Sequence, residues 1–209
     1  MLPQLRKLER RYPHELTVIS VHSPKFPTER ETAHLRQAVL RHRIEHPVLN
    51  DAEFHYWQQL GARAWPTLYF VDPLGKVIGR HEGEIQAAAV EPLLESWLGE
   101  YRSQGLLDGT PLPLERTTGI ESPLSFPGKV TYDGASERLF VADSNHDQIV
   151  VARLDGSVER VIGSGEPGLA DGAPATARFQ QPQGMTVARA AGAAAWWVWR
   201  RVSGGGGWF

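Results

Sequence analysis

The dipeptide Trp65-Pro66 stands directly before an apolar, β-prone run at residues 67–71, and this order constrains the fold more than any other part of the sequence. A turn with aspartate, proline and glycine follows at residues 72–75, and a second short run leads back over residues 76–81. Such a pair of runs predicts an antiparallel hairpin. Proline lacks an N–H for the ladder, so it is tolerated at the first residue of a strand, where an X-Pro bond is a candidate for the cis isomer.

The composition excludes several classes of function. The chain has 209 residues and no cysteine, so it has no disulfide, no thiolate nucleophile and no cysteine-based zinc site. Its net charge of −2 argues against nucleic acid or an anionic membrane as the main partner. The first residues carry charges and no run of about 18 apolar residues occurs, so we expect a cytoplasmic location.

Helical and strand-like segments alternate in residues 1–104. The periodicity predicts strands at residues 16–21 and 47–49, and helices at residues 2–12, 29–42, 52–60 and 93–101. Thr28 and Glu31 have the spacing of a capping box, and Asp51 suits the N-cap of the third helix. Pro92 fits the first turn of the last helix, with residues 85–90 as a separate or kinked turn. The alternation predicts parallel neighbouring strands with the antiparallel hairpin at the end.

The texture of the chain changes after residue 104. Residues 105–121 are rich in glycine, proline and polar residues, as is typical of a linker. Short strand candidates then follow at residues 124–130, 139–142, 148–152 and 158–162. Four antiparallel strands of this size make one blade of a β-propeller. Residues 182–187 echo residues 127–131 at an offset of 55, so residues 122–187 are predicted to hold one blade and the start of a second.

Residues 188–209 form an atypical, low-complexity tail. Alanine, glycine and arginine dominate its start, and a tryptophan-rich run and a glycine run follow. We therefore expect no strand-turn-strand unit there, and a shift of reading frame or a premature end near residue 189 would explain the change. Because one blade cannot bury both of its faces alone, we expect the second half to be marginally stable or disordered in isolation. The tryptophan-rich tail is a predicted aggregation hazard, because it would expose an apolar patch.

One glycine pattern and one carboxylate pattern resemble ligand-binding motifs, but we favour a purely structural role for both. Residues 163–168 match the dinucleotide fingerprint Gly-x-Gly-x-x-Gly, but a proline and further loop-forming residues stand where a helix must begin, so an inter-blade loop is predicted. Asp143, Asn145 and Asp147 have the spacing of a calcium loop. Gln148 replaces the glycine that such a loop requires, so we predict turn-capping side chains.

Histidine and serine patterns give no site either. His42 and His46 are four residues apart, as zinc ligands on a helix would be, but Pro47 restricts His46 to an extended conformation. No set of serine, histidine and carboxylate shows a nucleophile motif such as Gly-x-Ser-x-Gly. We therefore predict no catalytic residue, no bound metal and no cofactor for this chain.

Three segments resemble one known family. Residues 21–27, 46–51 and 65–67 are similar to the thioredoxin-like domain of proteins that join it to an NHL-repeat β-propeller, the NHL-repeat-containing protein two group. Residues 141–146 resemble the diagnostic strand-turn segment of that family, although Asp147 stands where the family has leucine.

The resemblance implies a fold and a domain order. Residues 1–104 would form an α/β thioredoxin-like three-layer domain that lacks its first strand. A partial β-propeller of about one NHL blade would follow the linker. The Cys-x-x-Cys pair of the family would fall just upstream of Met1, so either the true start lies further upstream or the redox pair has been lost.

The resemblance also implies a binding site. Trp65, Pro66 and Thr67 would flank a groove in which the main chain pairs with an extended partner segment, by strand addition. The alternative is that Pro66 only shapes the hairpin and Trp65 only packs. We therefore predict a non-catalytic protein-interaction scaffold with a protein or peptide partner, and neither nucleic acid nor membrane. The alternative function is a thiol–disulfide oxidoreductase whose cysteines lie upstream of this chain.

Overall fold

The computed structural model describes residues 1–110, 122–190 and 193–200. It is a mixed α/β structure with small sheets, and none of the sheets closes within the described ranges. The chain divides into two compact units, Met1–Gly119 and Ile120–Phe209. In the first unit the elements are α1 (Leu2–Arg11), β1 (Ser20–His22), the 3₁₀ turn η1 (Pro27–Arg30), α2 (Thr32–Arg41), β2 (Val48–Asn50), α3 (His55–Gln59), β3 (Thr67–Val71), β4 (Val77–Glu82) and α4 (Ala87–Ser103).

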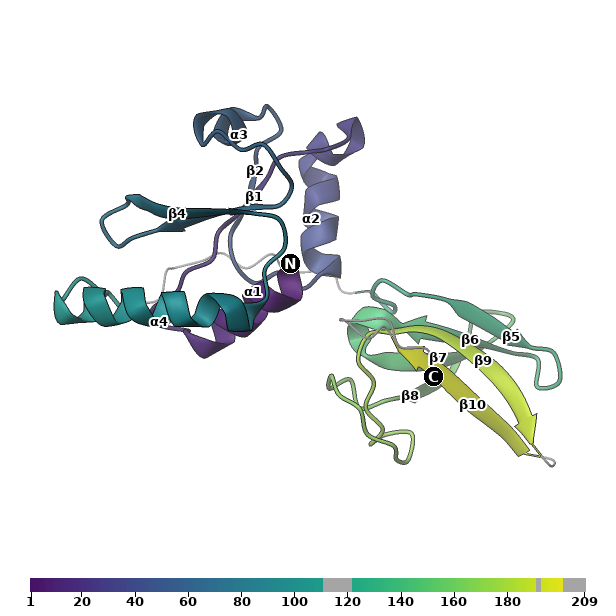
Figure 1. Cartoon of the computed structure of the whole chain (residues 1–209). Helices are drawn as coiled ribbons and strands as arrows, with labels where there is room; N and C mark the ends of the chain where they lie inside the picture. Colours follow the sequence, from purple (N-terminus) through teal and green to yellow (C-terminus); the bar gives the residue numbers. More distant parts are fainter. Residues whose placement is uncertain (111–121, 191–192, 201–209) are drawn as a thin grey trace. The chain divides into compact units, whose positions relative to one another are not determined.

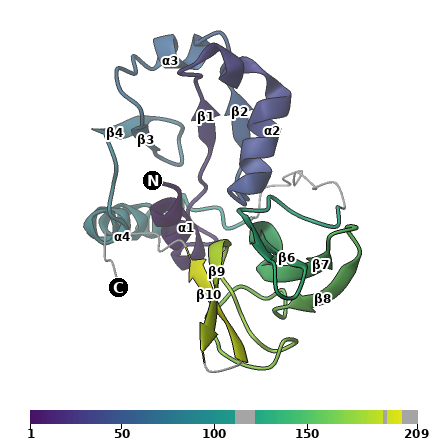
Figure 2. The same ribbon diagram turned by 90° about the vertical axis from the view of Figure 1, so that its right-hand side faces the viewer.

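The core of the first unit lies between α1 and α4, which run side by side in Figures 1 and 2. The i, i+4 spacing of Leu8 and Tyr12 places both side chains on one side of α1 and its C-terminal end, and both are buried there. Leu94 and Leu98 are buried from α4. Strand β3 adds Phe70, whose ring lies 5.3 Å from that of Trp97 in α4.

Helix α4 is continuous through Pro92, so the predicted place of this proline in the first turn of the helix is wrong. The helix begins at Ala87, and Pro92 lies inside it. In an α-helix the missing N–H of Pro92 removes a single hydrogen bond, to the carbonyl of Ala88. Val90 and Leu94, on either side of the proline, are both buried in the core, and this burial holds the helix together across the missing bond.

The strands of the first unit form two separate pairs. β1 pairs with β2 in parallel, with Val21 opposite Leu49, and β3 pairs with β4 in an antiparallel hairpin, with Leu68 opposite His81. The predicted strand at residues 16–21 is therefore shorter and later, at Ser20–His22. In Figure 2 the hairpin lies on the side of β1 opposite β2.

The Trp65–Pro66 peptide bond, directly before β3, is cis. No described strand pairs with both β1 and β3, so the single sheet of a three-layer domain is not formed, and the layering stays a prediction.

The second unit contains a four-stranded antiparallel sheet in the order β5-β6-β7-β8. Its first strand begins later than the predicted Leu124, because the segment before it holds two prolines that cannot donate to a ladder. The elements are β5 (Val130–Asp133), β6 (Arg138–Asp143), the 3₁₀ turn η2 (Ser144–His146), β7 (Gln148–Arg153), β8 (Val158–Ile162), β9 (Pro182–Ala190) and β10 (Ala193–Arg200).

The two faces of this sheet are both apolar, but they are not equally covered. On one face Phe140, Ala142, Ile149 and Val151 are buried, and Met185 of β9 packs against them. The other face carries a row of directly opposed valines, one from each strand. The outer two, Val130 and Val161, are 59% and 42% exposed, whereas the inner two, Val141 and Val150, are buried.

The expectation that no strand-turn-strand unit follows Val187 is wrong for the residues that the structure describes. β9 and β10 pair in an antiparallel hairpin, with Val187 opposite Trp196 and Thr186 opposite Trp197. Tryptophan and valine favour the extended conformation, so the run at residues 196–199 suits a strand even though the segment before it is rich in alanine. The last part of the predicted tail, residues 201–209, lies outside the described residues, as does most of the predicted linker at residues 105–121.

Two neighbouring leucines of α4 test the core of the first unit. Leu94 is 8% exposed and Leu93 is 52% exposed. We expect Leu94→Ala to lower the free energy of unfolding by about 2–5 kcal/mol, because it leaves a cavity between α1 and α4. Leu93→Ala is the control and should cost less than about 1 kcal/mol. Urea unfolding followed by circular dichroism measures both, and equal losses would contradict this packing.

Candidate functional site

The predicted site residues lie at the start of β3, where the chain leaves the loop after α3. Trp65 is 49% exposed. The carbonyl of Pro66 accepts a hydrogen bond from Gly83 N at 2.8 Å, which joins the segment to the end of the hairpin. The Thr67 hydroxyl donates to the carbonyl of Ala64 at 2.7 Å. The backbone on both sides of the proline is therefore held, while much of the tryptophan stays accessible.

The indole of Trp65 is fixed from two directions. Its Nε1–H donates to the carbonyl of Ser23 at 2.9 Å, and its ring stacks on that of Trp57 with centroids 4.1 Å apart and planes at 29°. Stacking of this kind adds about 0.5–1.5 kcal/mol beyond the area that it buries. Because the Trp65 ring is already ordered, its side chain loses little further conformational entropy when a ligand packs against its exposed part.

A buried carboxylate holds the elements around this tryptophan pair. Asp51 is 3% exposed. Its Oδ2 accepts the Ser23 hydroxyl at 2.8 Å and Trp57 N at 3.0 Å, and its Oδ1 accepts Tyr56 N at 3.0 Å. Asp51 therefore accepts N–H groups of the first turn of α3, as a capping side chain does, but the N-cap residue is Phe54, because the helix begins later than predicted, at His55. The same side chain also ties that helix to the loop after β1.

The environment of Asp51 sets the direction of its pKa. Burial of the carboxylate acts to raise the pKa, and it is the largest single influence. Hydrogen bonds from the Ser23 hydroxyl and from the backbone N–H groups of Tyr56, Trp57 and His55 act in the opposite direction. Together they outweigh burial, so the pKa of Asp51 lies below its ordinary value and the group is ionised at neutral pH.

The loop after β1 carries a cation near the Trp65 ring and a second exposed aromatic ring. Lys25 Nζ lies 6.0 Å from the centre of the Trp65 ring, at the outer limit of a cation–π contact. Phe26 is more than half exposed. Glu29 holds the loop, since its Oε2 accepts the backbone N–H groups of Lys25 and Phe26 at 2.8 and 3.2 Å. The predicted capping box of Thr28 and Glu31 is thus replaced by Glu29 and the residues before it.

The groups at this site are of the kind that contact a ligand. It offers an ordered aromatic surface, one ammonium group and backbone polar groups. The carboxylate of Asp51, which holds Ser23 and Trp57 beside the Trp65 ring, already accepts hydrogen bonds from several donors. Within the described part of the chain no group of three or more histidine, aspartate or glutamate side chains could hold a metal ion.

The glycine-rich segment at residues 163–168 lies in a loop against the four-stranded sheet. Its backbone N–H groups are used inside the protein: Gly163 N donates to the carbonyl of Pro174 at 2.7 Å and Gly168 N to that of Phe179 at 2.9 Å. Gly163 has a φ of +119°, and a Cβ there would meet the backbone of Asp147 and Gln148 at 3.1 Å. Close packing and backbone conformation therefore account for this glycine without a nucleotide.

The carboxylates of the calcium-like pattern support the turn after β6. Asp143 is fully buried, and its Oδ1 accepts Ser125 N at 2.6 Å while its Oδ2 lies 2.7 Å from Nδ1 of His146. Asp147 Oδ1 accepts Gln181 N at 2.8 Å. These hydrogen bonds tie the turn to the segments that precede β5 and β9, which agrees with the structural interpretation.

The histidine pair is not brought together as a metal site. His46 lies between Glu9 and Ser20, and the carbonyl of His42 accepts a hydrogen bond from Arg6.

Sequence reasoning missed the partners of Trp65. The helix predicted at residues 52–60 includes Trp57, and Lys25 has no predicted role. Neither contact has a local signal: Lys25 is 40 residues from Trp65, and the stacking of Trp57 depends on how α3 packs against the start of the hairpin. The buried Asp51, followed by a helix with a tryptophan on its first turns, is the pattern that indicates such a support.

Replacing the buried carboxylate tests this support. Asp51→Asn should lower the free energy of unfolding at neutral pH by about 1.5–3 kcal/mol, because charge-assisted hydrogen bonds are lost. A depressed pKa stabilises the fold above the unfolded-state value of about 3.9, and this part is lost as the pH falls through the folded-state pKa. The difference between Asp51→Asn and the parent should therefore shrink below about pH 4.

The matched control is Glu53→Gln, which changes an exposed carboxylate two residues away. Chemical unfolding measured across the acid range compares the two variants. A difference for Asp51→Asn that does not depend on pH would contradict the assignment.

Comparison with known proteins shows clear relatives. No protein-family model matches the chain. The chain is 42% identical over 192 residues to "Protein SUPPRESSOR OF QUENCHING 1, chloroplastic" of Arabidopsis thaliana, which covers 88% of this chain and 18% of that protein. It is 36% identical over 191 residues to NHL repeat-containing protein 2 of Bos taurus, and 35% identical to that of Homo sapiens, which in each case covers 90% of this chain and 26% of the relative.

The chain thus spans between about a fifth and a quarter of the length of these relatives. No helix in the described residues is long and apolar enough to cross a membrane. One relative is named as chloroplastic, so the cytoplasmic location stays a prediction. Over about nine tenths of its own length, the chain is a homologue of NHL repeat-containing protein 2 and of SUPPRESSOR OF QUENCHING 1.

Proposed function

We propose that this chain is a non-catalytic protein-interaction scaffold of the thioredoxin-like and NHL-repeat type, and that it binds an extended segment of a protein partner at Trp65, Pro66 and Thr67. One observation carries the proposal: Trp65 is locked by Ser23 and Trp57, yet it remains 49% exposed. Ordered, partly exposed tryptophan is the side chain most often found at the energetic centre of protein interfaces.

Strand addition is the binding mode that the backbone favours. The hydrogen bond from Gly83 N to the carbonyl of Pro66 sets the phase of the β3–β4 ladder. Because alternate residues of an antiparallel pair turn their polar groups toward the partner, Leu68 and Phe70 face β4, while Thr67 and Tyr69 face the opposite edge. That edge pairs with no strand among the described residues. A partner segment that pairs there places a side chain beside Trp65.

The finer fold of the first unit is part of the proposal. One parallel pair, one antiparallel hairpin and the helix pair α1 and α4 are the parts of a thioredoxin-like domain over residues 1–104. A strand placed between β1 and β3 would join the two pairs into a single sheet. This supports a domain that lacks its first strand.

The finer fold of the second unit is an NHL-type blade at residues 122–187. This proposal is supported by two residues that occupy equivalent positions in the sequence repeat. Met185 lies 55 residues after Val130, and Met185 packs on the covered face of the sheet. Val130 occupies the same place at the start of its own repeat, but it is 59% exposed. In a head-to-tail stack of such repeats, the preceding repeat would cover the face that holds Val130, just as β9 covers the face that holds Phe140. The blades of a propeller pack in this way.

Peptide selection tests the binding site. A random linear peptide library displayed on phage is selected against the full chain, and the enriched peptides are synthesised and titrated by tryptophan fluorescence and calorimetry. We expect Trp65→Ala to weaken their binding about 30-fold or more, since loss of a hot-spot tryptophan costs about 2 kcal/mol or more. Leu74→Ala, at the exposed tip of the same hairpin, is the control and should leave the affinity unchanged.

Two results would count against the proposal. One is a library that yields no peptide with affinity for the parent chain. The other is a set of peptides that bind Trp65→Ala as tightly as they bind the parent chain. Circular dichroism of the variant shows that the loss, where it occurs, does not arise from unfolding.

Reductase activity provides a separate test. The chain has no cysteine, so it should not accelerate the reduction of insulin by dithiothreitol above the rate without protein. Turbidity of the precipitating insulin chains measures the rate. Acceleration by the purified 209-residue chain would overturn the scaffold function and favour an oxidoreductase that works without its own thiols.

A further inference from the structure

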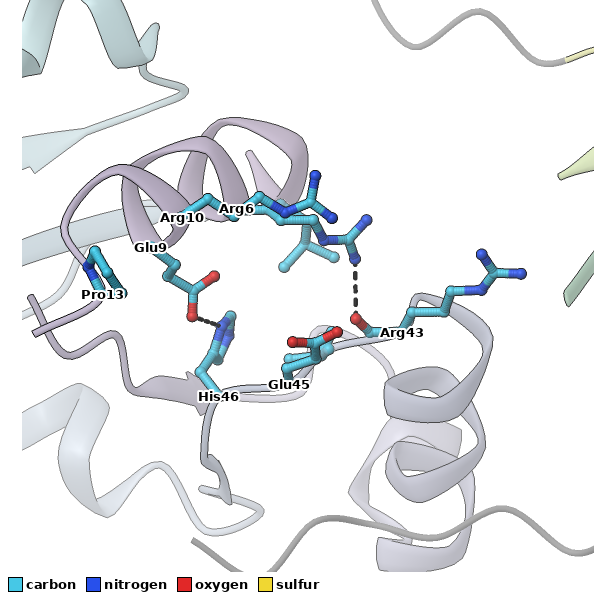
Figure 3. A pocket seen from close by; sticks show the side chains of 9 residues that line it. Arg6, Glu9, Arg10, Pro13, Arg43, Glu45 and His46 are labelled. Carbon is cyan, nitrogen blue, oxygen red and sulfur yellow. Dashed lines mark hydrogen bonds and ion pairs between the residues drawn. The ribbon is translucent and has the colours of Figure 1, made fainter. Parts of the chain in front are cut away.

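A hollow of about 230 Å³ lies between α1 and the loop that joins α2 to β2 (Figure 3). It is separate from the tryptophan site, since none of its lining residues belongs to the segments around Trp65. α1 contributes Arg6, Glu9 and Arg10, and the loop contributes Arg43, Glu45 and His46. Such a size is below the usual 300–1,000 Å³ of drug-sized sites, so it suits a small group.

Arg6 is fixed in place by the end of α2. Its Nη2 donates to the carbonyl of His42 at 2.8 Å and to that of Arg43 at 2.9 Å. These carbonyls lie just beyond the last residue of α2, where a cation is favoured. The guanidinium has five N–H donors, and these two bonds use one nitrogen, so the group can still donate to a ligand in the hollow.

His46 and Glu9 form the opposite wall. Glu9 Oε1 lies 2.9 Å from Nδ1 of His46, and Ser20 Oγ lies 2.8 Å from Nε2. An ionised carboxylate only accepts, so Nδ1 carries the proton, and the imidazole side chain is only 6% exposed. Figure 3 shows Glu9 turned toward His46. The carboxylate of Glu9 is therefore already engaged.

Arg10 is a further arginine of the hollow, beside Arg6 and Arg43. It lies one turn after Arg6 on α1, so the two guanidinium groups share one face of the helix. Like charges at this spacing are mutually unfavourable. Arg10 has no hydrogen-bond or ion-pair partner among the described residues, and Glu45, the remaining acidic side chain of the lining, forms no ion pair with it. An anion between the two guanidinium groups would relieve their repulsion.

We propose that this hollow binds a phosphate group, held by the guanidinium groups of Arg6 and Arg10. Each guanidinium group can donate two parallel N–H hydrogen bonds to phosphate oxygens, which an ammonium group cannot do. Leu2, Pro13 and Ile44 also line the hollow, so an organic group attached to the phosphate would meet an apolar surface. Glu45 also lines the hollow, and its charge weakens the binding of an anion.

Calorimetric titration of the full chain with inorganic phosphate and with glycerol 3-phosphate tests the proposal. We expect binding at about millimolar concentration or tighter for at least one of them. Arg10→Gln should weaken it about tenfold or more, because a charge-assisted hydrogen bond is lost. Glu45→Gln should strengthen it a few-fold by removing a like charge. Tighter binding of the ester identifies a phosphorylated small molecule as the ligand, and equal binding identifies free phosphate.

The control variant is Arg36→Gln, which removes an exposed arginine of α2 that does not line the hollow. It should leave the dissociation constant unchanged. The proposal is overturned if neither anion binds in this range, or if Arg36→Gln weakens binding as much as Arg10→Gln does. Neither outcome bears on the peptide site, because Trp65 lies outside the hollow.

Discussion

The buried carboxylate of Asp51 is the constraint on which the candidate site depends. It accepts hydrogen bonds from the loop after β1, through Ser23, and from the first turn of α3, through Tyr56 and Trp57. A buried charge is tolerated only when such donors surround it. Because Ser23 and Trp57 are also the two residues that hold the Trp65 ring, the carboxylate positions the exposed tryptophan without touching it.

Local chemistry predicts the parts of this fold, but it does not predict their assembly. The hairpin at residues 67–82 follows from its β-prone runs and its turn, and Asp51 follows from the preference of aspartate for helix starts. Pro92 was misplaced because local rules do not include the core that holds α4 together on both sides of it. The stacking of Trp57 on Trp65 has no local signal, since it depends on how α3 meets the hairpin.

In the second unit, the sequence repeat relates two apolar residues, but it does not predict the strand pair at the end of the described chain. The offset of 55 residues relates Val130 to Met185, and Met185 packs on the covered face of the sheet, which is the observation behind the proposed stacking of repeats. No strand pair was expected after residue 187, because the segment that begins there is dominated by alanine, glycine and arginine. Pairing with β9 gives these residues a ladder, and hydrogen-bonded pairing overrides weak propensity.

The free edge of β3 connects the two proposals about the first unit. A strand that completes the sheet between β1 and β3 and a partner segment that pairs with β3 would both use the polar groups of Thr67 and Tyr69. Each backbone N–H or C=O group forms one hydrogen bond in a ladder. The completing strand and the partner segment can therefore both bind only if the completing strand leaves Thr67 unpaired. Trp65 lies before the ladder begins, so it stays accessible in either case. A partner would then be recognised mainly through the tryptophan, with the edge of β3 adding direction.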